Sequence, residues 1–198
     1  MLKAKTVNLV FLVILVLMGI FDWFNEMSSW WYAVVGIIYL NIQAYGAAVL
    51  SAEFFLPVKS QGDRSSNKIA ITFDDGPIPV MTHKILDVLT AHKVPAAFFC
   101  IGYRVKDYPA LRKRIYDAGH LIGNHSYWHG ALFDLQSPEK IAIELIETDS
   151  AIENVIHKKP NFFRPPFGVT NPMVASAVRK RGYKTIRWSI RSFDSVTK

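Results

Sequence analysis

Two long apolar stretches open the chain, and a region of alternating short apolar runs and amphipathic segments follows them. The stretches cover residues 7–24 and 30–50, with a short polar gap at 25–29. Each is long enough to cross a bilayer, for which about 20 residues suffice. Aromatic residues typical of membrane interfaces flank the gap, namely Trp23, Trp30, Trp31 and Tyr32. We therefore expect residues 1–52 to form a membrane region with two hydrophobic helices.

Two alternatives for this region stay open. The first stretch also has the form of a cleaved signal peptide, with Lys3 and Lys5 as its charged start. No small-x-small cleavage site follows it and a second apolar stretch does, which favours the hairpin. The second stretch contains Asn41 and Gln43, which leaves a membrane-embedded or a peripheral helix open.

The remainder of the chain reads as a linker and an α/β domain. Residues 53–67 are predicted to be the linker, because 57–67 is polar and rich in turn residues. Over 68–198, apolar strands are predicted at about 68–73, 95–101, 120–123, 161–164 and 183–189, and amphipathic helices at about 79–93, 107–118, 137–157 and 171–181. This alternation is typical of a parallel sheet, either open or curled into a barrel.

Two adjacent carboxylates, Asp74 and Asp75, follow the strand at 68–73 and precede a Gly-Pro turn. The carboxyl ends of parallel strands are where α/β folds bind ligands. Neighbouring ionised carboxylates repel each other, so a buried pair needs a cation or a shared proton. Taken alone, an Asp-Gly turn with solvated acids is the simpler interpretation.

Two histidines four positions apart, His125 and His129, follow the strand at 120–123. If this segment turns helically, both imidazoles lie on one face and reach one ion. Two imidazoles and a carboxylate form a three-ligand set that leaves coordination positions open for water and substrate. Alone, the spacing fits two surface histidines equally well. The place of both motifs at strand ends favours a shared metal site.

An arginine loop and a last segment reach the same edge of the predicted sheet. Arg164 follows an apolar strand and precedes two prolines, which make the loop rigid. Its guanidinium can bind a carboxylate bidentately and keep it ionised, although a surface arginine in a structural turn stays open. The segment 188–195 ends the last strand and adds an aromatic, a base and an acid.

The net charge limits the kinds of partner that the chain can bind, and the single cysteine is informative about the core. The formal charge is +7, and residues 51–198 carry all of it, because Lys3 and Lys5 cancel Asp22 and Glu26. A basic domain suits an anionic polymer or lipid headgroups. Nucleic acid is not expected, because the sequence has no recognition module. The single cysteine, Cys100, lies in an apolar run and is expected in the core.

Three of these motifs, in this order, resemble those of the polysaccharide deacetylase family, the NodB-homology group also classed as carbohydrate esterase family four. They are Thr72-Phe73-Asp74-Asp75-Gly76, His125-Ser126-x-x-His129 and Arg164-x-Pro166-Phe167. The resemblance covers about 68–195. It implies an α/β fold with a distorted, incomplete (β/α) barrel, here preceded by two hydrophobic helices. Family members remove acetyl groups from N-acetylated sugars in peptidoglycan, chitin-like chains or exopolysaccharides.

The resemblance also assigns roles within the motifs. It implies that Asp75, His125 and His129 hold a divalent metal, with Zn²⁺ as the first expectation and Co²⁺, Mn²⁺ or Ni²⁺ as alternatives. A water on that metal would attack the amide carbonyl, with Asp74 as the general base and Arg164 orienting it. The residues expected to contact the glycan are Tyr127, Trp128, Pro166, Phe167 and Trp188.

The sequence departs from the family pattern near its end. The fourth motif, usually Asp-x-x-Asp-Trp, is reduced to Asp194, which we retain as a candidate catalytic residue. The last motif, a leucine-rich strand ending in the general-acid histidine, is missing before Lys198. We therefore expect a truncated copy that binds metal and deacetylates poorly.

Three functions compete at this point. The first is a membrane-tethered, metal-dependent deacetylase acting on an acetylated polysaccharide. The second is a catalytically incomplete glycan-binding or membrane scaffold protein that retains the barrel. The third, a non-haem iron oxygenase, uses the same ligand set. The second acid beside the ligand and the Arg-Pro-Pro-Phe loop suit hydrolysis better.

The side of the membrane is a separate question. Basic residues precede and follow the hairpin, and only acids lie in its gap, which favours a cytoplasmic domain. The family acts mostly outside the cytoplasm, and large domains translocate despite loop charge. We expect an extracytoplasmic domain, and the oligomeric state is left open.

Overall fold

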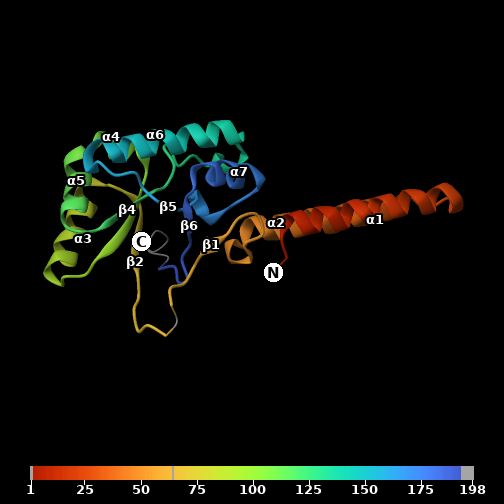
Figure 1. Ribbon diagram of the computed structural model, residues 1–198, viewed down its shortest axis with the longest axis horizontal. Coiled ribbons are helices and arrows are strands. Elements are labelled where there is room, and N and C mark those ends of the chain that lie inside the picture. The colour runs from red at the N-terminus through yellow and green to blue at the C-terminus, as the bar shows by residue number, and fades with distance from the viewer. Residues whose placement is uncertain (1, 64, 193–198) are drawn as a thin grey trace.

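The fold is built on a parallel sheet, seen in a computed structural model that describes residues 2–63 and 65–192 (Figure 1). Six strands pair in the order β1-β6-β5-β4-β3-β2, and every pair is parallel. The strands are β1 (Val58–Lys59), β2 (Ile71–Gly76), β3 (Ala96–Cys100), β4 (Leu121–Asn124), β5 (Phe162–Phe163) and β6 (Lys184–Ile186). Because β1 and β2 form the two edges, the described sheet stays open.

Helices follow the strands as the alternation predicts. They are α1 (Ala4–Asn25), α2 (Trp30–Ala48), α3 (Pro79–Ala91), α4 (Gly102–Asp107), α5 (Pro109–Asp117), α6 (Pro138–Ile156) and α7 (Pro172–Arg181), with short 3₁₀ turns η1 (Leu50–Ala52), η2 (Phe133–Leu135) and η3 (Pro166–Gly168). Ser137 and Asn171 cap α6 and α7 through their side chains. The helix predicted at 107–118 is α5, and the short helix α4 before it was not predicted; α4 ends at Asp107, before Pro109 starts α5.

Part of the segment predicted as a linker belongs to the sheet and the core. Val58 and Lys59 pair with Thr185 and Ile186, so β1 forms the sheet edge opposite β2. The preceding residues 54–56 are each no more than 6% exposed. They share a hydrophobic cluster with residues of α6 and α7. The chain is therefore tied into the domain almost immediately after α2.

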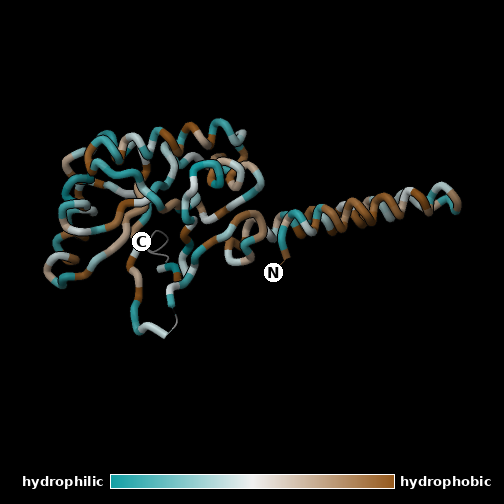
Figure 2. The backbone as a smooth tube through the Cα atoms, viewed as in Figure 1, coloured by the Kyte–Doolittle hydropathy of each residue, from teal (hydrophilic) through white to brown (hydrophobic). Residues whose placement is uncertain are grey.

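The N-terminal helices form a hairpin that projects from the domain (Figure 1), and hydrophobic residues predominate along it (Figure 2). Tyr39 and Gln43 of α2 donate hydrogen bonds to the Asn8 side chain of α1. The prediction of two hydrophobic helices is confirmed, with Gln43 facing its neighbour. Among the described residues, only α1 is long and apolar enough to cross a membrane. A membrane role for α2 stays a prediction.

The core of the domain consists of two hydrophobic clusters. One cluster joins the hairpin base to α6 and α7, and the other packs α3, α5 and the far part of α6 against β3 and β4. Cys100 belongs to the second cluster, as predicted from its apolar surroundings. Burial raises the pKa of its thiol to about 12, so it stays protonated and unreactive.

Candidate active site

The three motifs meet at the carboxyl edge of the sheet. Asp74 and Asp75 lie at the end of β2, His125 directly follows β4, and Arg164 directly follows β5. Parallel strands bring these ends to one edge. Residues about fifty and about ninety positions apart in the chain thereby become neighbours, as hydrogen bonds and ion pairs between them show.

A β-bulge at the end of β2 changes the direction of the Asp74 and Asp75 side chains. Phe73 pairs with Phe98 and Gly76 pairs with Cys100, so β2 carries one residue more than β3 over this interval. Adjacent side chains of a regular strand point to opposite faces, and a bulge changes that direction locally. Asp75 takes a left-handed backbone conformation here, with φ of 62°. Both carboxylates can therefore serve one site.

Asp75, His125 and His129 form a compact cluster of potential metal ligands. Asp75 Oδ1 lies 3.5 Å from His125 Nε2 and 3.3 Å from His129 Nε2, and the three ligand atoms all lie within 4.8 Å of one another. The His125 Nδ1–H donates to the Arg164 carbonyl oxygen at 2.7 Å, which directs its Nε2 lone pair to the cluster. One ion can reach all three atoms.

The electrostatics of this cluster favour a cation. The neighbouring His125 imidazole is the largest cause that lowers the pKa of the Asp75 carboxyl, and the charge of Arg104 adds to it. Burial lowers the pKa of His129. An ionised carboxylate and a neutral imidazole are the forms that bind a divalent metal. Two nitrogens and one oxygen fit Zn²⁺ and related divalent ions.

The histidine segment is a loop rather than the helical turn that its spacing suggests. Ser126 and His129 have φ of 63° and 52°, in the left-handed region. The Ser126 hydroxyl accepts the His129 amide at 3.0 Å, and the Asn124 side chain accepts the Ser126 amide at 2.9 Å. These local bonds, and not helical periodicity, bring the two imidazoles together.

A buried carboxylate on α6 supports this loop from behind. Glu144 is 6% exposed, and its Oε2 accepts the backbone amides of Tyr127 and Trp128 at 3.1 and 3.0 Å. Gln136 donates to its other oxygen. The sequence motifs do not include Glu144. The signal that could have found it is an acidic residue on the apolar face of a predicted helix, next to Leu145.

Removing the Glu144 carboxylate should weaken metal binding, although Glu144 is not itself one of the potential ligands. We expect Glu144→Ala to lower zinc affinity by roughly 10-fold, since groups that orient ligands typically contribute 10- to 100-fold. The part-buried amides of Tyr127 and Trp128 would also lose their acceptor, at about 1 kcal/mol each. Zinc titration against a chromogenic chelator measures the first effect. Glu147→Ala, exposed on the same helix, is the matched control, and equal affinities in both variants would contradict the role.

Asp74 is held by two side chains. Arg164 Nη1 lies 2.6 Å from Asp74 Oδ1, and the Trp188 indole N–H donates to Asp74 Oδ2 at 3.0 Å. The bidentate pair expected from sequence is therefore a single contact, because the same Nη1 also donates to Thr72. The guanidinium lies over the Phe99 ring, with 4.0 Å between its central carbon and the ring centroid, and Arg164 is 1% exposed.

The residues expected to contact a glycan differ in exposure. Trp128 is 62% exposed and Phe167 is 53% exposed, with its ring centroid 4.8 Å from that of His129. Tyr127 and Trp188 are half-buried and Pro166 is buried. Trp188 also holds Asp74, so it belongs to the support of the acid as well. Asp194 lies outside the described residues.

The family is identified by comparison with known proteins. The family model for polysaccharide deacetylase matches residues 61–186. The chain is 41% identical over 121 residues to a peptidoglycan-N-acetylglucosamine deacetylase of Bacillus cereus, covering 61% of this chain and 56% of that protein. It is 38% identical over 134 residues to the peptidoglycan-N-acetylmuramic acid deacetylase PdaA of Bacillus subtilis, covering 67% and 51%. The chain thus spans about half the length of these curated relatives.

Solved structures agree with this match. The structure of Bacillus subtilis PdaA, a family 4 carbohydrate esterase, superimposes with a TM-score of 0.61 at 37% identity, covering 67% of this chain and 57% of that one. A pseudoenzyme of the same family from Bacillus anthracis gives a TM-score of 0.66 at 28% identity, covering 71% and 50%. The expected distorted, incomplete (β/α) barrel is confirmed, and the chain belongs to the polysaccharide deacetylase family, carbohydrate esterase family four.

Proposed function

We propose that this chain hydrolyses the acetamido group of N-acetylated sugars in a polysaccharide of the peptidoglycan or chitin type. The observation that carries the proposal is a carboxylate held beside a metal-ligand cluster without belonging to it. Asp75 supplies the anionic ligand, and Asp74 stays bound to Arg164 and Trp188. Asp74 lies close enough that its charge acts on the His129 imidazole. A ligand and a neighbouring base are what metal-assisted hydrolysis requires.

The roles follow from these contacts. Asp75, His125 and His129 would hold a divalent ion, with Zn²⁺ first and Co²⁺, Mn²⁺ or Ni²⁺ as alternatives. When bound, such an ion polarises a carbonyl and lowers the pKa of water to about 7. Asp74 accepts the proton of the attacking water, and Arg164 orients that carboxylate through their ion pair. Trp128 and Phe167 offer exposed flat surfaces to the sugar rings.

The leaving amine must receive a proton, and the other histidines do not lie where they could supply it. His83 contacts Arg114 of α5, and His120 precedes β4 at the opposite edge of the sheet. His92 and His157 follow the ends of α3 and α6. We therefore propose that none of these four histidines donates the proton to the amine.

Acetate release from a chitin oligosaccharide tests the proposal. We expect the zinc-loaded chain to release acetate, and Asp74→Asn to reduce the rate by about 100-fold or more while zinc stays bound, because a general base contributes about 10²–10⁴-fold. Asp117→Asn, exposed on α5, is the control. Equal rates for the chain and Asp74→Asn, or no effect of a chelator, would rule out this mechanism.

A non-catalytic glycan-binding protein is the second candidate. It is favoured by the similarity to a pseudoenzyme of the same family. In that case the oligosaccharide binds with equal affinity to the chain and to Asp74→Asn, and neither releases acetate. The same pair of proteins therefore separates the two functions.

We further propose that the N-terminal hairpin anchors the domain in a membrane, with the domain on the extracytoplasmic side. The length and apolar composition of α1 support the anchor, and its residues are almost entirely exposed outside the domain. Protease accessibility in intact cells decides the side: cleavage of the domain from outside supports the proposal, and protection contradicts it.

A further inference from the structure

The base of the hairpin is built into the globular domain. Val7 of α1 is 3% exposed and belongs to the same core cluster as Phe133 and Val174. The Ala4 amide donates to the Phe54 carbonyl at 3.0 Å. No flexible spacer separates the two parts, so the position of the hairpin determines the position of the domain.

The length of the hairpin places this base at a membrane surface. At 1.5 Å per residue the 22 residues of α1 span about 33 Å, close to the hydrocarbon thickness of about 30 Å. Trp23 and Trp30 at the tip are 85% and 71% exposed, as interfacial aromatics are. With the tip at one interface, Ala4 and the end of α2 lie at the other.

Exposed apolar side chains of the domain lie next to that base. The Thr170 amide donates to the Ala47 carbonyl at the end of α2, and the neighbouring Asn171 side chain donates to the Asp134 carbonyl of η2. The residues flanking these two contacts are Leu132, Leu135 and Met173, which are 66%, 70% and 41% exposed. We call these three residues the apolar collar. They come from segments on the side of the domain from which the hairpin projects (Figure 1).

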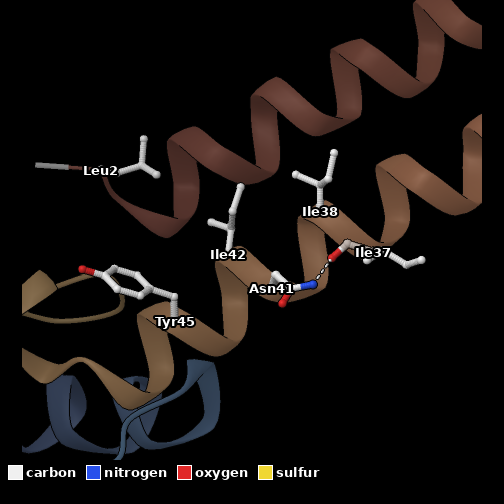
Figure 3. A pocket seen from close by; sticks show the side chains of 6 residues that line it. All are labelled: Leu2, Ile37, Ile38, Asn41, Ile42 and Tyr45. Carbon is white, nitrogen blue, oxygen red and sulfur yellow. Dashed lines mark hydrogen bonds between the residues drawn. The ribbon is translucent and has the colours of Figure 1, made fainter.

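The hairpin contributes apolar surface at the same level. A cleft of about 400 Å³ lies between the start of α1 and α2, lined by Leu2, Ile37, Ile38, Asn41, Ile42 and Tyr45 (Figure 3). Tyr45 is 61% exposed. Its backbone carbonyl accepts a hydrogen bond from the Val49 amide, one turn later at the end of α2. Apolar surface therefore extends along the hairpin to its base, where the Ala47 carbonyl accepts the Thr170 amide.

We propose that the domain itself rests on the lipid surface through the apolar collar, whose side chains enter the interfacial layer beside the hairpin. The proposal rests on the membrane anchor proposed above. Removing apolar surface from water is favourable, and the anchored hairpin already holds the collar at the bilayer. The domain is then fixed in orientation, and its reach for a glycan is limited to the vicinity of the membrane.

Single-cysteine labelling of the full chain in phosphatidylglycerol–phosphatidylcholine vesicles tests this contact. Cys100 is fully buried, so a cysteine introduced on the surface is the one that reacts. An environment-sensitive fluorophore is placed at Leu135→Cys, with Val88→Cys on α3 as the exposed control and Val16→Cys in α1 as the reporter of insertion. The vesicles carry spin-labelled lipids as quenchers.

We expect blue-shifted, lipid-quenched emission from positions 135 and 16, and water-like, unquenched emission from position 88. Replacing Leu132 and Leu135 by Asp should abolish quenching of a label at Met173→Cys while quenching at position 16 remains. Quenching at 16 without quenching at 135 overturns the collar and leaves the anchor standing. Absence of quenching at 16 overturns both. A blue shift at 135 that rises with protein concentration in the absence of lipid assigns the collar to a protein partner and overturns the proposal.

Discussion

Replacing Asp75 by asparagine should lower zinc affinity by at least about 100-fold. Asp75 is the only anionic member of the cluster, and groups outside a ligand set already contribute 10- to 100-fold. The change preserves the size of the side chain, which is half-exposed. Competition with a chromogenic chelator measures the affinity directly.

A thermal unfolding series gives an independent measure of the same loss. Saturating zinc should stabilise the chain by about 2.7 kcal/mol at 100 times its dissociation constant, and should stabilise Asp75→Asn by no more than about 0.4 kcal/mol at the same concentration. Asp117→Asn should behave like the unmodified chain, because Asp117 lies on the surface of α5. Equal zinc stabilisation of Asp75→Asn and the unmodified chain would exclude a metal centre at these residues.

Replacing Arg164 by leucine should destabilise the metal-free domain by about 3–5 kcal/mol. Arg164 is 1% exposed and the Asp74 side chain is 17% exposed, so the change leaves a largely buried carboxylate without its partner. Arg114→Leu removes a comparable pair with Asp87 on the surface, and exposed pairs contribute only about 0–1 kcal/mol. Urea unfolding of both variants makes the comparison.

The double variant shows whether the pair itself is responsible. Arg164→Leu combined with Asp74→Asn removes both charges, so its destabilisation should be clearly smaller than the sum of the two single effects. Additive effects would mean that Arg164 contributes by packing on Phe99 and not by its bond to Asp74.

The convergence of the three motifs was predictable from the sequence, because each motif follows a predicted parallel strand and such strands end at one edge of the sheet. Asp74, His125 and Arg164 each follow an apolar run, and alternation with helices predicts parallel strands. The support of the site was not predictable in the same way. Glu144 reaches the histidine loop from a helix about seventeen positions later, and Trp188 reaches Asp74 from the segment that follows β6.

The local backbone conformation at the site was also not predictable from the sequence. The bulge at Asp74 and Asp75 depends on pairing with β3, and the left-handed Ser126 and His129 depend on bonds within the folded loop. A His-x-x-x-His spacing suggests a helical turn, and only the folded loop shows another route to the same convergence. Likewise, Val58 and Lys59 form a strand because β6 offers them an edge.

The sequence by itself determined the strand and helix alternation, the hydrophobic hairpin, the three motifs and the family, because periodicity and motif spacing are properties of nearby residues. Tertiary structure alone decided that Glu144 supports the loop, that Arg164 makes a single bond to Asp74, and that the hairpin base enters the core. These features depend on contacts between residues far apart in the chain, whose partners are selected by packing and burial.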